Sequence, residues 1–94
     1  MDSKDSCWKA LVTLAIEKTL FDIGKPAYET IVDVLYKKYH CYIPDCFEKP
    51  EYLKAVLKEL CGESYNEIVN SIKQELKVGT ENKKIEMFLQ VLLQ

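Results

Sequence analysis

Apolar residues recur at spacings of three and four along nearly the whole chain, and no stretch alternates cleanly between apolar and polar residues as a half-buried strand would. The first row of apolar residues predicts a helix that begins near Asp5 or Ser6, either of which can cap free amides, and ends at Gly24. Its inward face is predicted to hold Trp8, Leu11, Val12, Ala15, Ile16, Leu20 and Ile23.

A second helix is predicted from Pro26 to about Tyr39. Proline suits the first helical position, where its missing amide costs nothing, and Lys37 and Lys38 fall in the last turn, where the helix dipole favours cations. Its apolar face is predicted to hold Ala27, Tyr28, Ile31, Val32, Leu35 and Tyr39, with Val34 beside them.

Three further helices are predicted from Pro50 to Cys61, from the capping pair Ser64 and Glu67 to Gly79, and from about Thr80 to the end. Five short helices joined by short connections predict an all-α protein, orthogonal or bundle-like. The inward residues are predicted to be Tyr52, Leu53, Val56, Leu57 and Leu60, then Tyr65, Ile68, Val69, Ile72 and Leu76, and finally Ile85, Phe88, Leu89 and Leu92.

Composition indicates one globular domain over residues 1–94, with an ordered core at about 6–93. The chain is 48% hydrophobic and 30% charged, as folded domains usually are. Its net charge is -2 and every basic residue is a lysine, which disfavours recognition of nucleic acid. No window reaches the ~20 apolar residues of a membrane span, and the N-terminus lacks the features of a secretory signal. We therefore expect a cytoplasmic protein, away from the membrane, with reduced cysteines.

The stretch HCYIPDCFEKP, residues 40–50, holds the only histidine and two of the four cysteines. Four ligands, His40, Cys41, Cys46 and Cys61, match the number that a zinc site needs. Their spacing does not fit a zinc site, because adjacent His40 and Cys41 point in different directions and Cys61 lies at the far end of a helix. We therefore expect no metal and no other cofactor.

Catalytic interpretations of the same stretch are also weak. A nucleophile–base pair of Cys46 and His40 would lack a nearby glycine-rich oxyanion element, and a phosphotransfer histidine would lie in the middle of an exposed helix. We expect no catalytic residue and no enzyme activity. The stretch is better explained as a corner in which Asp45 and Glu48 cap a single turn and both cysteines are small interior side chains. Aromatic residues are predicted to pin it to the core: Tyr39, Tyr42, Phe47 and Tyr52.

The stretch IPDCFEKPEYLKAVLKELCGESYNEIV is the most specific part of a wider pattern that runs from about Trp8 to Leu92. This pattern resembles a family of small helical domains in ammonia-oxidising archaea, the Nitrosopumilus-type output domains of signalling proteins. The resemblance implies a domain that is fused to receivers or sensors or stands alone, and that relays a signal without catalysis. It implies no catalytic residues, and it makes Cys46 and Pro50 framework residues of the corner.

Surplus apolar residues lie opposite the inward faces of two helices. Leu14 and Phe21, together with Ala10, do so on the first helix, and Met87 and Val91 do so on the last. Central packing is the commoner explanation for the first helix, whereas a terminal helix is usually peripheral. We predict that Leu14, Phe21, Met87 and Val91 contact a protein partner or a second copy of the chain.

The leading hypothesis is therefore a non-catalytic helical interaction module of archaeal signal transduction. Two alternatives stay open. One is a DNA-binding transcriptional output domain, which the resemblance favours and the acidic charge opposes. The other is a sensor domain that holds a small molecule between its helices, for which the sequence identifies no ligand.

Overall fold

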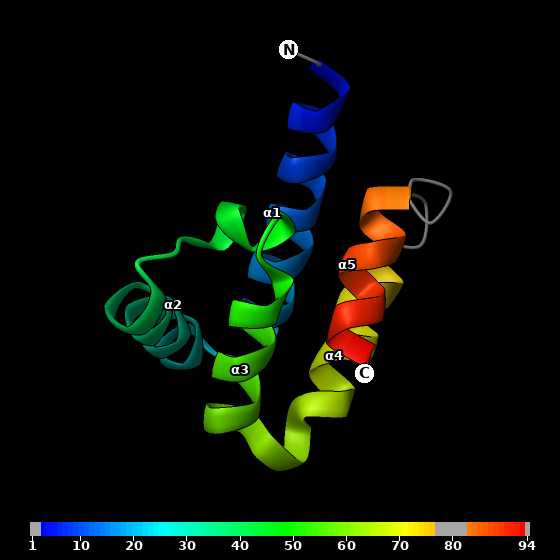
Figure 1. Ribbon diagram of the computed structural model, residues 1–94. Coiled ribbons are helices and arrows are strands. Elements are labelled where there is room, and N and C mark those ends of the chain that lie inside the picture. Colours follow the sequence, from blue (N-terminus) through cyan, green and yellow to red (C-terminus); the bar gives the residue numbers. More distant parts are fainter. Residues whose placement is uncertain (1–2, 77–82, 94) are drawn as a thin grey trace.

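The computed structural model describes residues 3–76 and 83–93, and within these residues it contains helices and no strand. The predicted all-α class is confirmed. Two short 3-10 segments, η1 and η2, flank the third helix (Figure 1). The elements are α1 (Ser3–Ile23), α2 (Lys25–Tyr39), η1 (Ile43–Phe47), α3 (Pro50–Cys61), η2 (Gly62–Ser64), α4 (Tyr65–Glu75) and α5 (Lys83–Leu93).

Most helix ends lie close to their predicted positions. The first helix begins at Ser3, slightly before the predicted Asp5 or Ser6, and α2 begins one residue before Pro26. The capping pair predicted for α4 is wrong in one respect: the side chain of Ser64 makes no capping hydrogen bond, because this residue belongs to the 3-10 turn η2. The predicted boundary at Gly79 and Thr80 lies outside the described residues.

A single residue, Gly24, joins α1 to α2. Its amide donates to the carbonyl of Leu20 at 3.1 Å, and its own carbonyl accepts from the amide of Tyr28 at 3.1 Å, so it takes part in both helices. Its backbone has φ 150° and ψ 148°, a conformation that residues other than glycine rarely adopt. The glycine therefore lets two helices meet at a corner without a loop.

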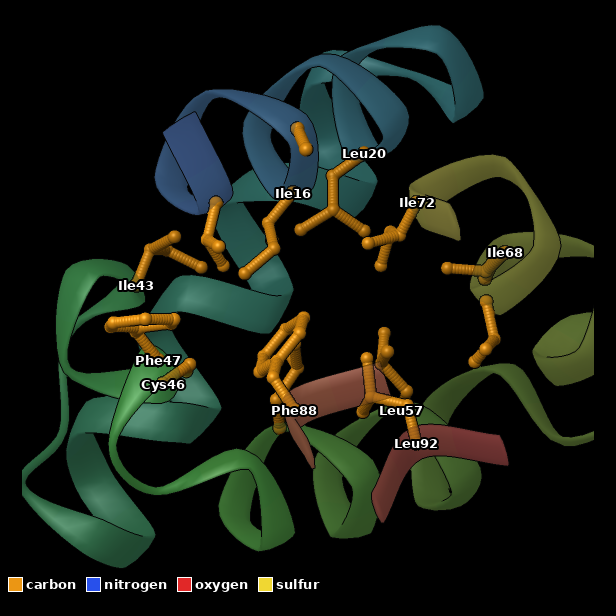
Figure 2. Packing of buried hydrophobic residues seen from close by; sticks show 14 of the residues in the cluster. Ile16, Leu20, Ile43, Cys46, Phe47, Leu57, Ile68, Ile72, Phe88 and Leu92 are labelled. Carbon is orange, nitrogen blue, oxygen red and sulfur yellow. The ribbon is translucent and has the colours of Figure 1, made fainter. Parts of the chain in front are cut away.

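The first helix is the spine of the structure, because it packs against α2, η1 and α4. The helices α4 and α5 pack against each other, and α5 also packs against α3 (Figure 1). Figure 2 shows Ile16 and Leu20 of α1 pointing into the same interior as Ile72 of α4 and Phe88 of α5, while Phe47 of η1 lies at its edge. One core cluster thus draws on every α-helix and on η1.

Two residues predicted to face inward are exposed instead. Ile23 is 49% exposed and Leu60 is 40% exposed. Each lies in the last turn of its helix, beyond the reach of the neighbouring helices, so the apolar row continues past the core. No helix in the described parts of the chain is long and apolar enough to cross a membrane.

A buried hydrogen bond ties the start of α4 to the end of α5. The hydroxyl of Tyr65 donates to the backbone carbonyl of Leu92, one of the last carbonyls of α5, which lack partners within the helix. Tyr65 and Leu92 are both buried, so neither group can turn to water if the bond is lost.

We predict that Tyr65→Phe lowers the free energy of unfolding by about 1–2 kcal/mol, because it leaves the buried carbonyl of Leu92 without a donor. Urea denaturation followed by circular dichroism measures the change. Tyr42→Phe is the matched control, since the Tyr42 side chain is 56% exposed and should tolerate the loss of its hydroxyl. Equal stabilities for the two variants would contradict this role of Tyr65.

Candidate functional site

The only histidine ends a helix. His40 is the C-cap of α2 and has left-handed backbone angles, φ 51° and ψ 41°, and no other non-glycine residue in the described ranges has a positive φ. Its amide donates to the carbonyl of Tyr36 at 2.8 Å, and the amide of Cys41 donates to that of Leu35 at 3.5 Å. The imidazole is exposed, with its ring edge against Tyr36 at 5.6 Å between centroids. These contacts give His40 a structural role at the helix end.

The single turn predicted at Asp45 and Glu48 forms earlier, as η1. The amide of Tyr42 donates to Oδ2 of Asp45 at 3.2 Å, and the amide of Asp45 donates to the carbonyl of Tyr42 at 2.9 Å. The predicted pairing of Asp45 with Glu48 is therefore wrong, because the turn starts at Ile43 and makes Tyr42 its N-cap. Glu48 instead faces Lys9 of α1, with 3.4 Å between Oε1 and Nζ.

The two cysteines of the corner are buried beside each other. Their Sγ atoms approach the same acceptor, the carbonyl oxygen of Tyr42, at 3.5 Å from Cys41 and 3.7 Å from Cys46. Burial raises the pKa of both thiols, and for Cys46 the neighbouring Cys41 raises it further. The thiols therefore stay protonated at neutral pH and pack as small interior side chains, as the sequence indicated.

The four residues considered as zinc ligands do not form one cluster. Cys61 lies at the end of α3 and lines a cavity with residues of α1 and α4, whereas His40 and Cys41 border a hollow near Tyr52. Within residues 3–76 and 83–93, no group of three or more histidine, cysteine, aspartate and glutamate side chains is placed to hold a metal ion.

Because the thiols of Cys41 and Cys46 are buried, the free energy of unfolding should decrease as the pH becomes alkaline. A thiol whose pKa is raised on folding contributes stability in full below the pKa of the unfolded chain, about 8.5, and loses it as pH rises above that value. The pKa of Cys46 in the folded chain lies well above that of a cysteine in the unfolded chain. We therefore predict that Cys46 alone lowers the free energy of unfolding by about 2 kcal/mol between pH 8 and pH 10.

Urea denaturation at both pH values, under reducing conditions, measures this fall. Cys46→Ala should be less stable than the native chain at pH 8 and should show a smaller fall toward pH 10. Val69→Ala, another truncation in the core, should lose stability at pH 8 but keep the whole fall. A fall of the same size in Cys46→Ala and the native chain would show that this thiol is not shielded.

The surplus apolar residues of α1 lie at the surface. Leu14 is 63% exposed and Phe21 is 49% exposed, on a face of α1 that the neighbouring elements leave largely uncovered, although the ring of Phe21 stacks on that of Tyr28 in α2. The expectation that α1 is surrounded on all sides is therefore wrong for this face. Three neighbours cover one side of the helix and leave the other to solvent.

The two residues predicted as partner contacts on α5 differ in exposure. Met87 is 64% exposed, whereas Val91 is partly buried. They lie on a helix that packs against α3 and α4, so they are on a different element from Leu14 and Phe21. A role in partner binding stays a prediction for all four residues.

Another apolar surface lies along α2. The ring of Phe21 stacks on that of Tyr28, with centroids 4.2 Å apart and 20° between the planes. Further along, the rings of Tyr36 and Tyr42 lie 5.3 Å apart. The hollow between these pairs is about 380 Å³, and Tyr28, Val32, Tyr36 and Tyr42 line it. We call the surface made by Phe21, Tyr28, Val32, Tyr36 and Tyr42 the aromatic groove.

Sequence reasoning missed this groove. Tyr28 and Val32 were assigned to the inward face, and Tyr42 was predicted to pin the corner to the core. The prediction for Tyr42 is wrong, because its backbone is extended at the N-cap of η1 and its ring turns toward Tyr36. A usable signal was the spacing of Tyr28, Val32 and Tyr36, each four residues apart, which marks a second row beside Ile31 and Leu35. The other three aromatic residues behave as predicted: Phe47 is buried, and Tyr39 stacks on Tyr52.

The rim of the aromatic groove is acidic. Glu29 and Asp33 line it directly, and Oε2 of Glu17 accepts a hydrogen bond from the Tyr28 hydroxyl at 3.0 Å. Burial, followed by the bond to Glu17, raises the pKa of Tyr28, so this hydroxyl stays a donor at neutral pH. Asp33 is paired with Lys37, with 3.0 Å between Oδ2 and Nζ. The groove thus offers an apolar floor and a negative border.

Comparisons of the chain with protein-family models, with curated proteins and with solved structures find no match. The resemblance to archaeal output domains therefore stays a prediction. The positions that remain as functional candidates are the aromatic groove, the exposed apolar residues of α1 and α5, and the cavity beside Cys61.

Proposed function

We propose that this chain is a non-catalytic helical interaction module, and that it relays a signal in the cytoplasm of an archaeon by binding a partner protein in the aromatic groove. The observation that carries the proposal is the pair of aromatic ring contacts, Phe21 with Tyr28 and Tyr36 with Tyr42, that flank an apolar hollow on the surface of α2. Contiguous apolar surface of this kind marks interaction sites, and aromatic residues dominate the energetics of interfaces. The resemblance to signalling output domains points the same way.

The partner that fits this groove is an amphipathic helix with aliphatic residues on one face and lysine or arginine at its edges. Side chains four residues apart on α2 form a ridge, and ridges of this kind pack against the grooves of a second helix. The carboxylates of Glu17, Glu29 and Asp33 complement basic residues. A two-fold contact between copies would instead bring the same carboxylates together, which disfavours self-association through this surface.

Self-association through α5 is the second candidate. The exposure of Met87 favours it, since methionine adapts to varied contact surfaces. A native mass spectrum distinguishes the two: a dimer that Met87→Glu returns to monomer would favour α5. A DNA-binding output domain is disfavoured by the net charge of -2 and by the acidic rim of the groove.

We predict that selection from a displayed library of helical peptides yields apolar, basic sequences that bind the aromatic groove. Fluorescence anisotropy should show that Tyr36→Ala weakens the binding of a selected peptide at least ~10-fold, as expected for a central aromatic contact. Met87→Ala, on α5, is the control and should bind as the native chain does.

Two results would refute this assignment. One is equal binding of the selected peptides to Tyr36→Ala and to the native chain. The other is enrichment of acidic peptides, which the rim of Glu17, Glu29 and Asp33 should repel. Circular dichroism of Tyr36→Ala should match the native chain, because Tyr36 is 44% exposed and outside the core.

A further inference from the structure

Two reduced cysteines meet inside the corner between α2 and η1. Cys41 and Cys46 have four residues between them, and their Sγ atoms lie 3.5 Å and 3.7 Å from one atom, the carbonyl oxygen of Tyr42. Burial raises the pKa of Cys46, and the charge and hydrogen bonding of Cys41 raise it further, as expected of two thiols in contact. The fold therefore holds two oxidisable sulfurs next to each other.

The other two cysteines lie on different parts of the structure. Cys7 is exposed near the start of α1, and Cys61, at the end of α3, lines the cavity bordered by α1 and α4. Cys41 and Cys46 are therefore the pair that the fold places to react with each other.

The backbone of the corner can keep its hydrogen bonds when this pair is oxidised. Oxidation removes two S–H donors from the Tyr42 carbonyl, but the amide of Asp45 donates to the same carbonyl at 2.9 Å. The amide of Tyr42 in turn donates to Oδ2 of Asp45 at 3.2 Å. Because the carbonyl keeps a donor, the loss of the thiol hydrogens leaves no unsatisfied backbone group in this turn.

The folded chain also holds the two ends of this short loop together before any bond forms. Ile43 and Phe47 are buried with Cys46 and anchor η1 in the core, where Figure 2 shows the three side chains close to one another. In the unfolded chain the same two cysteines are free to separate. A cross-link that fits the folded geometry stabilises a protein mainly by restricting the unfolded chain.

We propose that Cys41 and Cys46 are a redox-sensitive pair, which a small disulfide such as glutathione disulfide converts into an intramolecular disulfide that fastens the corner. This device does not depend on the aromatic groove or on its partner. It makes the stability of the fold respond to the ratio of oxidised to reduced small thiols around the protein.

The reaction proceeds by two exchanges. The Cys41 thiolate attacks one sulfur of glutathione disulfide, whose S–S bond breaks, and the first glutathione leaves. The Cys46 sulfur then attacks the sulfur of Cys41 in the mixed disulfide, and the second glutathione leaves. The protons of both protein thiols end on the two glutathione molecules, so the protein loses two electrons and the oxidant gains them. Cys41 reacts first because it borders the hollow beside His40, whereas Cys46 is fully buried.

The test equilibrates the whole chain with mixtures of reduced and oxidised glutathione, approached from both the reduced and the oxidised protein. Free thiols are then alkylated and the chain is digested with trypsin, which leaves Cys41 and Cys46 in one peptide, residues 39–54, without another cysteine. We expect this peptide to lose two hydrogens and to carry neither an alkyl group nor glutathione. Glutathione attached to this peptide in place of the internal bond, or links to Cys7 or Cys61, would overturn the proposal.

A second measurement asks whether the bond fits the fold. The equilibrium constant for forming it should be at least ~10-fold larger in the folded chain than in the chain unfolded by concentrated urea, and oxidation should raise the urea midpoint. Cys7→Ser should keep this rise, because Cys7 is exposed on α1, whereas Cys46→Ala should show none. An equal or smaller constant in the folded chain, or a midpoint that falls on oxidation, would show that the two sulfurs cannot bond within the fold.

Discussion

The packing of the short segment η1 against α1 is the contact on which the other helices depend. Ile43, Cys46 and Phe47 of η1 are buried, and Figure 2 shows them at the edge of the interior that Ile16 of α1 enters. The ion pair of Lys9 with Glu48 closes the same junction at the surface. Because α2 leads into this corner and α3 leaves it, fixing η1 on α1 also fixes where both helices run.

The corner also determines where the chemically reactive residues lie. The left-handed turn at His40 brings the chain back toward the core, so Cys41 and Cys46 lie inside, where burial raises their pKa values. The same turn brings Tyr42 beside Tyr36 on the outer side of α2. Buried thiols and an exposed aromatic surface are therefore two results of one change in chain direction.

Local signals were enough to predict the helices. Apolar spacing located their inward faces, and Gly24, Pro26 and Pro50 marked where they end or begin, because these residues act through their own backbone. Helical periodicity likewise separated Leu14 and Phe21 from the inward face of α1, and both are exposed. Which residues of one helix are covered by another helix depends on the tertiary packing, and local sequence signals do not show it.

The remaining features depend on contacts between distant segments. Ile23 and Leu60 continue apolar rows, and only the position of the neighbouring helices leaves them exposed. The aromatic groove needs the turn at His40, which no periodicity encodes. The cavity beside Cys61 combines the end of α1 with η2 and α4, so its lining can be seen only in the folded chain.

Native-state hydrogen exchange at the corner tests most directly whether η1 organises the fold. The amide of Asp45 donates to the carbonyl of Tyr42, and the amides of Glu48 and Lys49 donate to that of Asp45. If η1 is an integral part of the core, these three amides should exchange only through global unfolding, with the free energy of unfolding that urea denaturation gives. Exchange through a local opening of much lower free energy, while the amides of α1 and α3 stay protected, would contradict the account.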